Sequence, residues 1–251
     1  MKIARFKHNS KTEHGIVEGD KIRLLSGSIF DENIRIKSER VDINEVNLIH
    51  PVSPSKVICV GLNYRGHARE LKMPIPDEPV IFLKPPTSVI GPGDDIIYPQ
   101  GVRRLDHEAE LAIVIKRRAR KISYNQADEY ILGYVCLNDI TARDLQEKDG
   151  QWTRAKSFDT FCPIGPYICD EIDPDDAEIR LSVNGKLRQS SNTSDLIFPV
   201  RYLVSFVSFV MTLLPGDIIA TGTPKGVGPL SRGDEVDLNI ESIGSLVNRV
   251  V

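Results

Sequence analysis

The chain lacks the features that would point to nucleic acid or to a membrane. Its 251 residues carry 32 Lys and Arg against 35 Asp and Glu, so nucleic acid is not expected as a general partner. The start, MKIARFKHNS, has no apolar signal core. The longest mostly apolar run, between Arg201 and Pro215, falls short of the ~20 residues of a membrane span. We therefore expect a cytoplasmic protein with no membrane partner.

Cysteine is scarce, and its spacing excludes the common metal and redox motifs. The four cysteines, Cys59, Cys136, Cys162 and Cys169, form no CxxC pair. Three of them lie in apolar, strand-like surroundings. These positions favour reduced core residues over disulfides or zinc ligands.

Two widespread catalytic motifs are also missing. No Gly-x-Ser-x-Gly occurs, so the nucleophile turn of a serine hydrolase is not supported. The loop TGTPKGVG at 221–228 lacks the Gly-Lys-Ser/Thr of a P-loop and the spacing of GxGxxG. It is expected to be a turn with glycines at positive φ, or a backbone that a substrate can approach closely.

Strand patterns dominate what is present. Loosely alternating runs over 2–30, followed by two prolines within 41–56, predict a small β module up to about residue 50 and then a connector. Apolar runs at 57–61 and 80–85 predict strands of a larger domain. The segment 178–189 predicts a hairpin, because its central Asn-Gly pair suits a type I′ turn.

The sequence predicts only a few helices. Ser123-x-x-Gln126 resembles a capping box that opens a short helix over 124–130. A longer helix is expected from Pro199 to about Leu214, before Pro215-Gly216. Because helices do not alternate regularly with strands, a doubly wound parallel sheet is disfavoured, and we expect a β-rich α+β fold.

Three acidic residues next to buried strands are candidates for a metal site. Glu108 and Glu110 precede the apolar run 111–115, and residues two apart in a strand share a face, with Cα atoms about 6.5–7 Å apart. Asp139 follows the apolar run 131–137 and could add a third carboxylate. Oxygen ligands alone suit a hard cation such as Mg²⁺ or Mn²⁺. The alternative is a polar strand face with its charges in solvent.

A histidine and a glutamate three residues apart are candidates for a general base. His67 and Glu70 would share one face of a short helix, where the carboxylate could orient the ring. A pair at this spacing is also a common surface contact. His107 is adjacent to the acidic pair, but strand alternation turns it to the opposite face, so we do not predict it as a ligand.

Isolated cations could bind a substrate carboxylate. Lys84, Arg143 and Lys156 each lie beside apolar or small residues. Each could equally be solvated or paired with an acidic side chain. These residues alone leave the choice open.

The motifs taken together resemble the fumarylacetoacetate hydrolase family, in its bacterial and archaeal branch. The resemblance covers residues 57 to 229, with the last strands also fitting. Several motifs in the right order are more specific than any one of them. They are GLNYRGHARE, FLKPP, DHEAELAIVI, LNDITARDLQ, AKSFDTFCPIGP, VNGKLRQ and TGTPKGVGP.

The resemblance implies a metal site and a catalytic dyad. Glu108, Glu110 and Asp139 match the family's three carboxylate ligands for Mg²⁺ or Mn²⁺. His67 and Glu70 match its His–Glu dyad, on a segment that orders over the substrate.

The resemblance also implies five residues around the substrate. Lys156 matches a catalytic lysine beside the metal. Lys84, Arg143, Gln146 and Thr223 match positions that bind the substrate.

A fold and a reaction follow from the same resemblance. The fold would be a mixed β-roll or β-sandwich-like catalytic domain over 55–251, with the small N-terminal module over 1–50, paired as a homodimer. The expected reaction is metal-dependent hydrolysis of a C–C bond in a 2,4-diketo acid such as an acylpyruvate or fumarylpyruvate, through a metal-stabilised enolate. The alternatives are isomerisation of 2-hydroxyhepta-2,4-diene-1,7-dioate and decarboxylation of oxaloacetate, which the motifs do not separate from hydrolysis.

Overall fold

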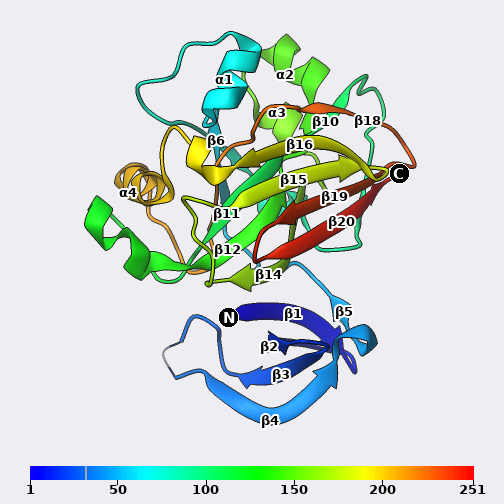
Figure 1. The fold of residues 1–251 in the computed structure, drawn as a ribbon, viewed down its shortest axis with the longest axis vertical. Coiled ribbons are helices and arrows are strands. Elements are labelled where there is room, and N and C mark those ends of the chain that lie inside the picture. The colour runs from blue at the N-terminus through cyan, green and yellow to red at the C-terminus, as the bar shows by residue number, and fades with distance from the viewer. Residues whose placement is uncertain (32) are drawn as a thin grey trace.

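Most strands of the protein belong to one long mixed sheet (Figure 1). The computed structural model describes residues 1–31 and 33–251. Two short strands pair off the main path, β5 (Asn47–Leu48) with β1 and β8 (Val89–Ile90) with β14. The main path runs in the order β4 (Arg35–Asp42), β3 (Lys21–Ser26), β2 (Lys11–Glu18), β1 (Lys2–His8), β14 (Cys162–Cys169), β12 (Ile131–Asn138), β11 (Ala109–Ile115), β17 (Ile218–Ala220), β6 (Val57–Gly61) and β7 (Val80–Lys84).

Two smaller sheets complete the β structure. One has the order β16 (Lys186–Asn192), β15 (Glu178–Val183), β19 (Glu235–Ile240), β20 (Gly244–Val250) and β9 (Asp95–Ile96). The other has the order β13 (Thr141–Ala142), β10 (Leu105–His107) and β18 (Gly228–Leu230).

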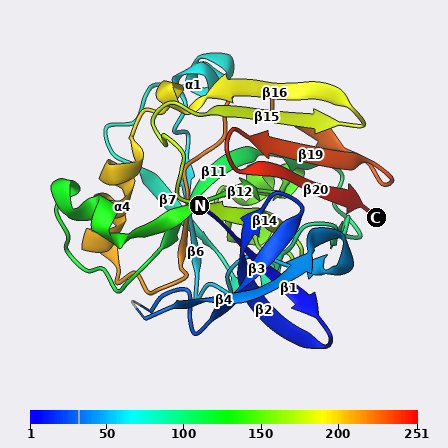
Figure 2. The ribbon, with the colours of Figure 1, turned by 60° about the horizontal axis from the view of Figure 1, so that its bottom comes forward.

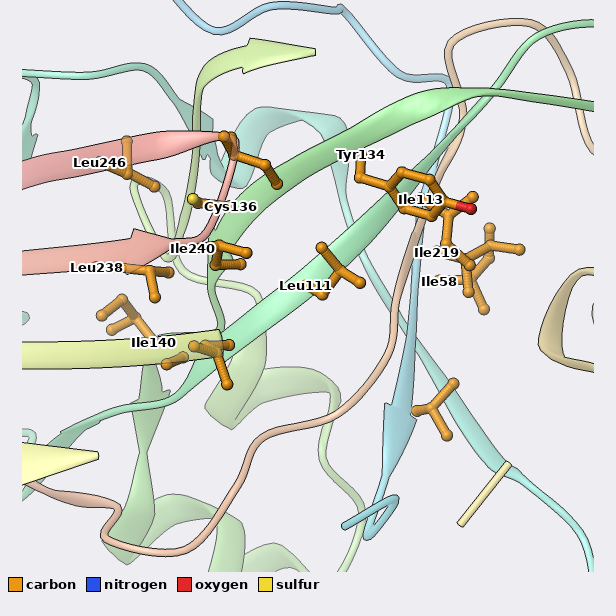
Figure 3. Close-up of a cluster of buried hydrophobic side chains, with 14 of the residues drawn as sticks. Ile58, Leu111, Ile113, Tyr134, Cys136, Ile140, Ile219, Leu238, Ile240 and Leu246 are labelled. Atoms are coloured by element: carbon orange, nitrogen blue, oxygen red, sulfur yellow. The ribbon is translucent and has the colours of Figure 1, made fainter. Parts of the chain in front are cut away.

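The main core lies between the long sheet and the sheet of β15, β19 and β20. Leu111 and Ile113 on β11 belong to the same buried cluster as Leu238, Ile240 and Leu246 (Figure 3). Burying each such side chain contributes about 1.5–3 kcal/mol relative to leaving it exposed. This packing gives a rigid base for the polar residues at the start of β11.

The helices gather around one end of the sheets. Figure 1 shows α1, α2 and α3 together at the end of the molecule opposite the N-terminal strands, with α4 at the side. None of the helices in residues 1–31 and 33–251 is long and apolar enough to cross a membrane. The α-helices are α1 (Arg65–Leu71), α2 (Arg143–Asp149), α3 (Thr153–Lys156) and α4 (Val200–Val210), and the 3-10 helices are η1 (Ile43–Glu45), η2 (Pro86–Ser88), η3 (Tyr124–Tyr130) and η4 (Thr193–Asp195).

The predicted β-rich α+β fold is confirmed, and so is its clearest hairpin. β15 and β16 pair antiparallel. Asn184 and Gly185 between them have φ of 51° and 72°, as a type I′ turn requires. The four cysteines are free and buried, as their surroundings predict.

The long helix ends earlier than predicted. It begins after Pro199 as expected, but stops at Val210 instead of Leu214. Met211 is extended, and Leu213 forms a β-bridge with Ala119. This tertiary pairing takes the backbone groups that further helical turns would use.

The N-terminal strands continue the long sheet. β1 pairs antiparallel with β14, with Lys2 opposite Cys169 and Ile3 opposite Ile168. Figure 2, which brings the N-terminal strands forward, shows them lying against β14. They also have a small apolar cluster of their own, which includes Phe6 and Ile22. The division of the chain near residue 50 stays a prediction.

Candidate active site

Three buried carboxylates converge where β11 begins and β12 ends. β11 and β12 pair antiparallel, and the Asp139 N–H donates to the Glu108 carbonyl oxygen at 2.9 Å. This pairing places Asp139 beside Glu108 and Glu110, which are two residues apart in an extended segment and so share a face. One carboxylate oxygen from each residue lies within 4.8 Å of the others. All three are less than a tenth exposed.

Buried cations surround these carboxylates. The Lys156 amine donates to Glu108 Oε2 at 2.9 Å and to Asp139 Oδ2 at 2.6 Å. The Lys84 amine contacts the other Asp139 oxygen and donates to the Ile140 carbonyl at 3.2 Å. A charged group buried without such partners would cost several kcal/mol, about 3–5 when one member of a buried pair is removed.

Arg143 connects the site to a further buried acid. Its Nε donates to Asp106 at 2.8 Å, and its guanidinium contacts Glu108. Arg104 holds Asp106 from the other side, at 2.9 and 3.1 Å. Asp106 is fully buried, so the two arginines share and neutralise its charge. Its bond to Asp106 therefore holds the Arg143 guanidinium against the Glu108 carboxylate.

The surroundings push the pKa values of the two neighbouring glutamates in opposite directions. Burial raises the pKa of Glu108, but the charges of Lys156 and Arg143 outweigh burial and lower that pKa overall. Burial raises the pKa of Glu110, and the negative charges of Asp139 and Glu108 raise it further. A cation bound at these carboxylates would favour the ionised form of Glu110, so metal binding is expected to compete with protonation of this residue.

The donor set suits a hard divalent cation. Three carboxylates with no cysteine or histidine among them match the oxygen preference of Mg²⁺ and Mn²⁺. The raised pKa of Glu110 indicates that its negative charge is not fully compensated by protein groups. The triad Glu108, Glu110 and Asp139 is therefore the part of the structure best suited to hold a metal.

The histidine–glutamate pair lies on α1 beside the carboxylates. His67 Nδ1 lies 2.9 Å from Glu70 Oε2, as the i,i+3 spacing on one helical face predicts. The Gly226 N–H contacts the same carboxylate, at 3.1 and 3.3 Å from its two oxygens. Because a carboxylate oxygen accepts hydrogen bonds, Nδ1 is the donor of this pair, and in the neutral tautomer with that one proton Nε2 is an acceptor.

A cavity of about 300 Å³ joins these groups. Glu70 borders a neighbouring cavity that His67 and Arg143 also line. Lys84 is not among the described residues that line the 300 Å³ cavity, although its amine contacts Asp139, which does line it. Its contact with substrate stays a prediction, and the contacts that the structure shows are with Asp139 and the Ile140 carbonyl. The predicted site residues that line the cavity are His67, Glu108, Glu110, Asp139, Arg143, Gln146, Lys156 and Thr223.

One wall of the cavity is aromatic. Phe82 and Trp152 meet edge to face with ring centroids 5.2 Å apart, and the Lys156 amine lies 5.2 Å from the Phe82 ring centre. A Cβ added at Gly61 would lie 2.7 Å from the Trp152 ring. Only glycine therefore allows Trp152, the single tryptophan of the chain, to pack on this strand.

Three further side chains that the structure places at or next to the candidate site were not identified by the sequence analysis. Asp106 lies two residues before Glu108, so strand alternation could have identified it as a further acid on the same face. Trp152 carries no motif of its own. Gln189 is fully buried and contacts the site from the β15–β16 hairpin, about 80 residues from the acidic strand. Local patterns contain no signal for a contact over that separation.

Comparisons with known proteins agree with the geometry. Residues 56–251 match a family model described as fumarylacetoacetate (FAA) hydrolase C-terminal, and residues 1–51 match one described as Rv2993c-like, N-terminal. A 5-carboxymethyl-2-hydroxymuconate delta-isomerase from Mycobacterium smegmatis is 45% identical, with a TM-score of 0.94, over 100% of this chain and 99% of that one.

Two further similar proteins are also named for an activity. A 2-hydroxyhepta-2,4-diene-1,7-dioate isomerase from Mycobacterium marinum is 43% identical, with a TM-score of 0.93, over 100% of this chain and 98% of that one. An oxaloacetate tautomerase, FAHD2B, mitochondrial, from Bos taurus is 43% identical over 83% of this chain and 70% of its own length. With a family model matched over more than half of its length, the chain belongs to the fumarylacetoacetate hydrolase family of enzymes.

Proposed function

We propose that the protein interconverts the keto and enol forms, or the double-bond isomers, of a 2-oxo acid, with Mg²⁺ or Mn²⁺ held by Glu108, Glu110 and Asp139. One observation carries this proposal. His67, which is hydrogen-bonded to Glu70, borders the same cavity as the three carboxylates, so a base adjoins the place where a carbonyl oxygen would be polarised. Proton transfer next to a carbonyl needs these two elements.

The bound ion would act as a Lewis acid on the substrate's carboxylate and 2-oxo oxygens. His67 Nε2 would take the proton from the carbon next to the 2-oxo group, and Glu70 would stabilise the ring as it becomes positively charged. The Lys156 ammonium would stabilise the negative charge that develops on the 2-oxo oxygen. His67 would then return the proton to oxygen, or to a carbon further along the conjugated chain.

The names of the three similar proteins described above, which are more identical to this chain than the similar proteins named as hydrolases, favour this reaction over hydrolysis. Two are isomerases and one is a tautomerase. All three reactions move a proton and break no C–C bond. The site residues can perform such a step without an attacking water.

Hydrolysis of a C–C bond in a 2,4-diketo acid is the second candidate. The description of the matching family model favours it, and His67 Nε2 could draw a proton from water as readily as from carbon. The hydroxide would add to the distal carbonyl. The C–C bond would then break to give a carboxylic acid and the enol of a 2-oxo acid such as pyruvate.

A substrate panel with Mg²⁺ or with EDTA separates the candidates. It would contain oxaloacetate, 2-hydroxyhepta-2,4-diene-1,7-dioate, acetylpyruvate and fumarylpyruvate. An absorbance change without bond cleavage supports tautomerisation or isomerisation, release of pyruvate supports hydrolysis, and release of CO₂ supports decarboxylation. If none of these acids reacts in the presence of Mg²⁺, the proposed function is wrong.

The role of His67 has its own test. His67→Ala is expected to reduce turnover by about 10²–10⁴, the usual range of general acid–base catalysis. Mg²⁺ binding measured by calorimetry should be unchanged, because His67 is not among the carboxylate ligands. Turnover at the parent rate would contradict the assignment of the base.

The homodimer expected from the family stays a prediction. Size-exclusion chromatography with light scattering would measure the mass of the protein in solution. One chain has a mass of 28.0 kDa, so a homodimer would have twice that mass.

A further inference from the structure

The helix that carries His67 and Glu70, α1, has little apolar packing to hold it in place. It is seven residues long, and of these residues only Ala68 is buried. Helices shorter than about 12–15 residues are marginal on their own, and in proteins most helical stability comes from packing an apolar face. The position of His67 must therefore depend on polar contacts from neighbouring segments.

The first turn of α1 takes its cap from a distant segment. The first N–H groups of a helix have no partner within it, and the N-cap residue Tyr64 supplies no side-chain acceptor. Instead, Asp195 Oδ2, at the end of η4, accepts from the Gly66 N–H at 2.7 Å. An added Cβ at Gly66 would lie 2.9 Å from that same oxygen, so glycine leaves room for the approach. Asp195 thus holds the residue next to His67.

The chain just before α1 is joined to the same segment. Tyr64 and Leu196 form an antiparallel β-bridge. The side chain of Asn63, which is fully buried, accepts from the Phe198 N–H at 2.8 Å and donates to the Phe198 carbonyl at 3.1 Å. The carboxylate of Asp195 is therefore presented to the helix from a fixed stretch of backbone.

The other end of α1 is held through Glu70. The Gly226 N–H donates to Glu70 Oε1 at 3.1 Å, and Glu70 Oε2 lies 2.9 Å from His67 Nδ1. Gly226 has φ of 93°, and an added Cβ would lie 2.3 Å from the Arg188 carbonyl oxygen, so this loop has little freedom. Because Glu70 is bound to the loop, a shift of the first helical turn would change how the His67 ring meets it.

We propose that Asp195 is a positioning residue that holds the first turn of α1, and so keeps His67 hydrogen-bonded to Glu70 and directed at the cavity. The inference rests on the proposed function, because turnover depends on this geometry only if His67 is the base. Asp195 is not among the described residues that line the 300 Å³ cavity, so it would act through His67. If Asp195 only stabilised the fold, its loss would lower the Tm and leave turnover of the folded protein unchanged.

Two conservative variants separate the reach of the side chain from its charge. Asp195→Asn keeps an oxygen at the same reach, and Asn caps helices about as well as Asp, so this variant should keep most of the parent's kcat. Asp195→Glu keeps the charge but moves the carboxylate by one methylene. Its kcat should fall about 10- to 100-fold, as a small misplacement of a catalytic group can cause, with KM and Mg²⁺ binding nearly unchanged. The kinetics use an acid that the parent converts, at a temperature where the variants are folded.

A double-mutant comparison shows whether the loss passes through His67. Asp195→Glu should have little further effect on kcat in the His67→Ala background, because residues that act as one unit are non-additive. Asp42→Ala is the matched control, since Asp42 caps η1 by accepting from the Asn44 N–H at 2.9 Å, and it should leave kcat unchanged. If Asp195→Glu does not fold, Asp195→Ala serves in the same comparisons.

The NMR signal of the His67 ring tests the geometry without any substrate. The Nδ1 proton that His67 shares with Glu70 should exchange slowly with water in the parent. Its signal is identified among the five histidines by its loss in His67→Ala. It should persist in Asp195→Asn and disappear in Asp195→Glu, whereas a fold-stabilising role alone leaves it in place in both.

Any one of three results would overturn the inference: turnover of Asp195→Glu at the parent kcat, an intact Nδ1 signal in that variant, or an equal loss of kcat in the parent and His67→Ala backgrounds. Failure of the proposed function looks different. The parent would then convert none of the acids in the substrate panel, while the Nδ1 signal would still decide whether Asp195 positions His67.

Discussion

Lys84→Met is expected to destabilise the metal-free protein while leaving substrate affinity nearly unchanged. The Lys84 and Asp139 side chains are 0% and 1% exposed. Removing one partner of a buried pair costs about 3–5 kcal/mol. The lower end applies here, because Lys156 still donates to Asp139 at 2.6 Å.

The predicted loss converts into a measurable shift in thermal stability. At about 2–4 °C per kcal/mol for a chain of this size, a loss of about 3 kcal/mol lowers the Tm by roughly 6–12 °C. Saturating Mg²⁺ should restore part of it, because a bound cation replaces the lost positive charge and stabilises the folded state by mass action.

The assay is thermal unfolding with EDTA and with Mg²⁺, followed by substrate kinetics at a temperature where the variant is folded. Lys21→Met is the control, since Lys21 and Asp42 form an exposed pair at 2.9 Å and such pairs contribute little. An unchanged Tm together with a large rise in KM would refute the reasoning. It would show that Lys84 binds substrate instead of holding Asp139.

Four other predictions concern the metal and the cavity wall. Glu108→Ala should abolish Mg²⁺ binding in calorimetry and all activity. Because the pKa of Glu110 is raised by burial and by Asp139 and Glu108, Mg²⁺ affinity should fall as pH falls, by about tenfold per pH unit for each proton displaced. For the same reason, metal-free stability should decrease as pH rises toward that pKa, and a pH-independent affinity would contradict both. Gly61→Ala should force the Trp152 ring to move, shift its fluorescence and raise KM.

Local patterns were enough to predict much of the fold. The β15–β16 hairpin follows from the Asn184-Gly185 turn, and the strand that continues after Glu110 follows from its unbroken apolar run. The side-by-side arrangement of Glu108 and Glu110 follows from strand alternation alone. The end of α4 could not be found in this way, because pairing between Leu213 and Ala119 competes with helix formation.

The sequence by itself determined which residues could carry the chemistry: two glutamates on one strand face, an aspartate at the end of the next strand, and a histidine one helical turn from a glutamate. Only the tertiary structure decided how these groups act together. It buried Lys84 against Asp139, joined Arg143 to Asp106, and directed Gln189 at Thr223. The physical reason is that these contacts join residues 34 to 55 positions apart in the chain, where no periodicity or turn preference acts. Their distances, burial and hydrogen-bond directions are set by how the sheets pack.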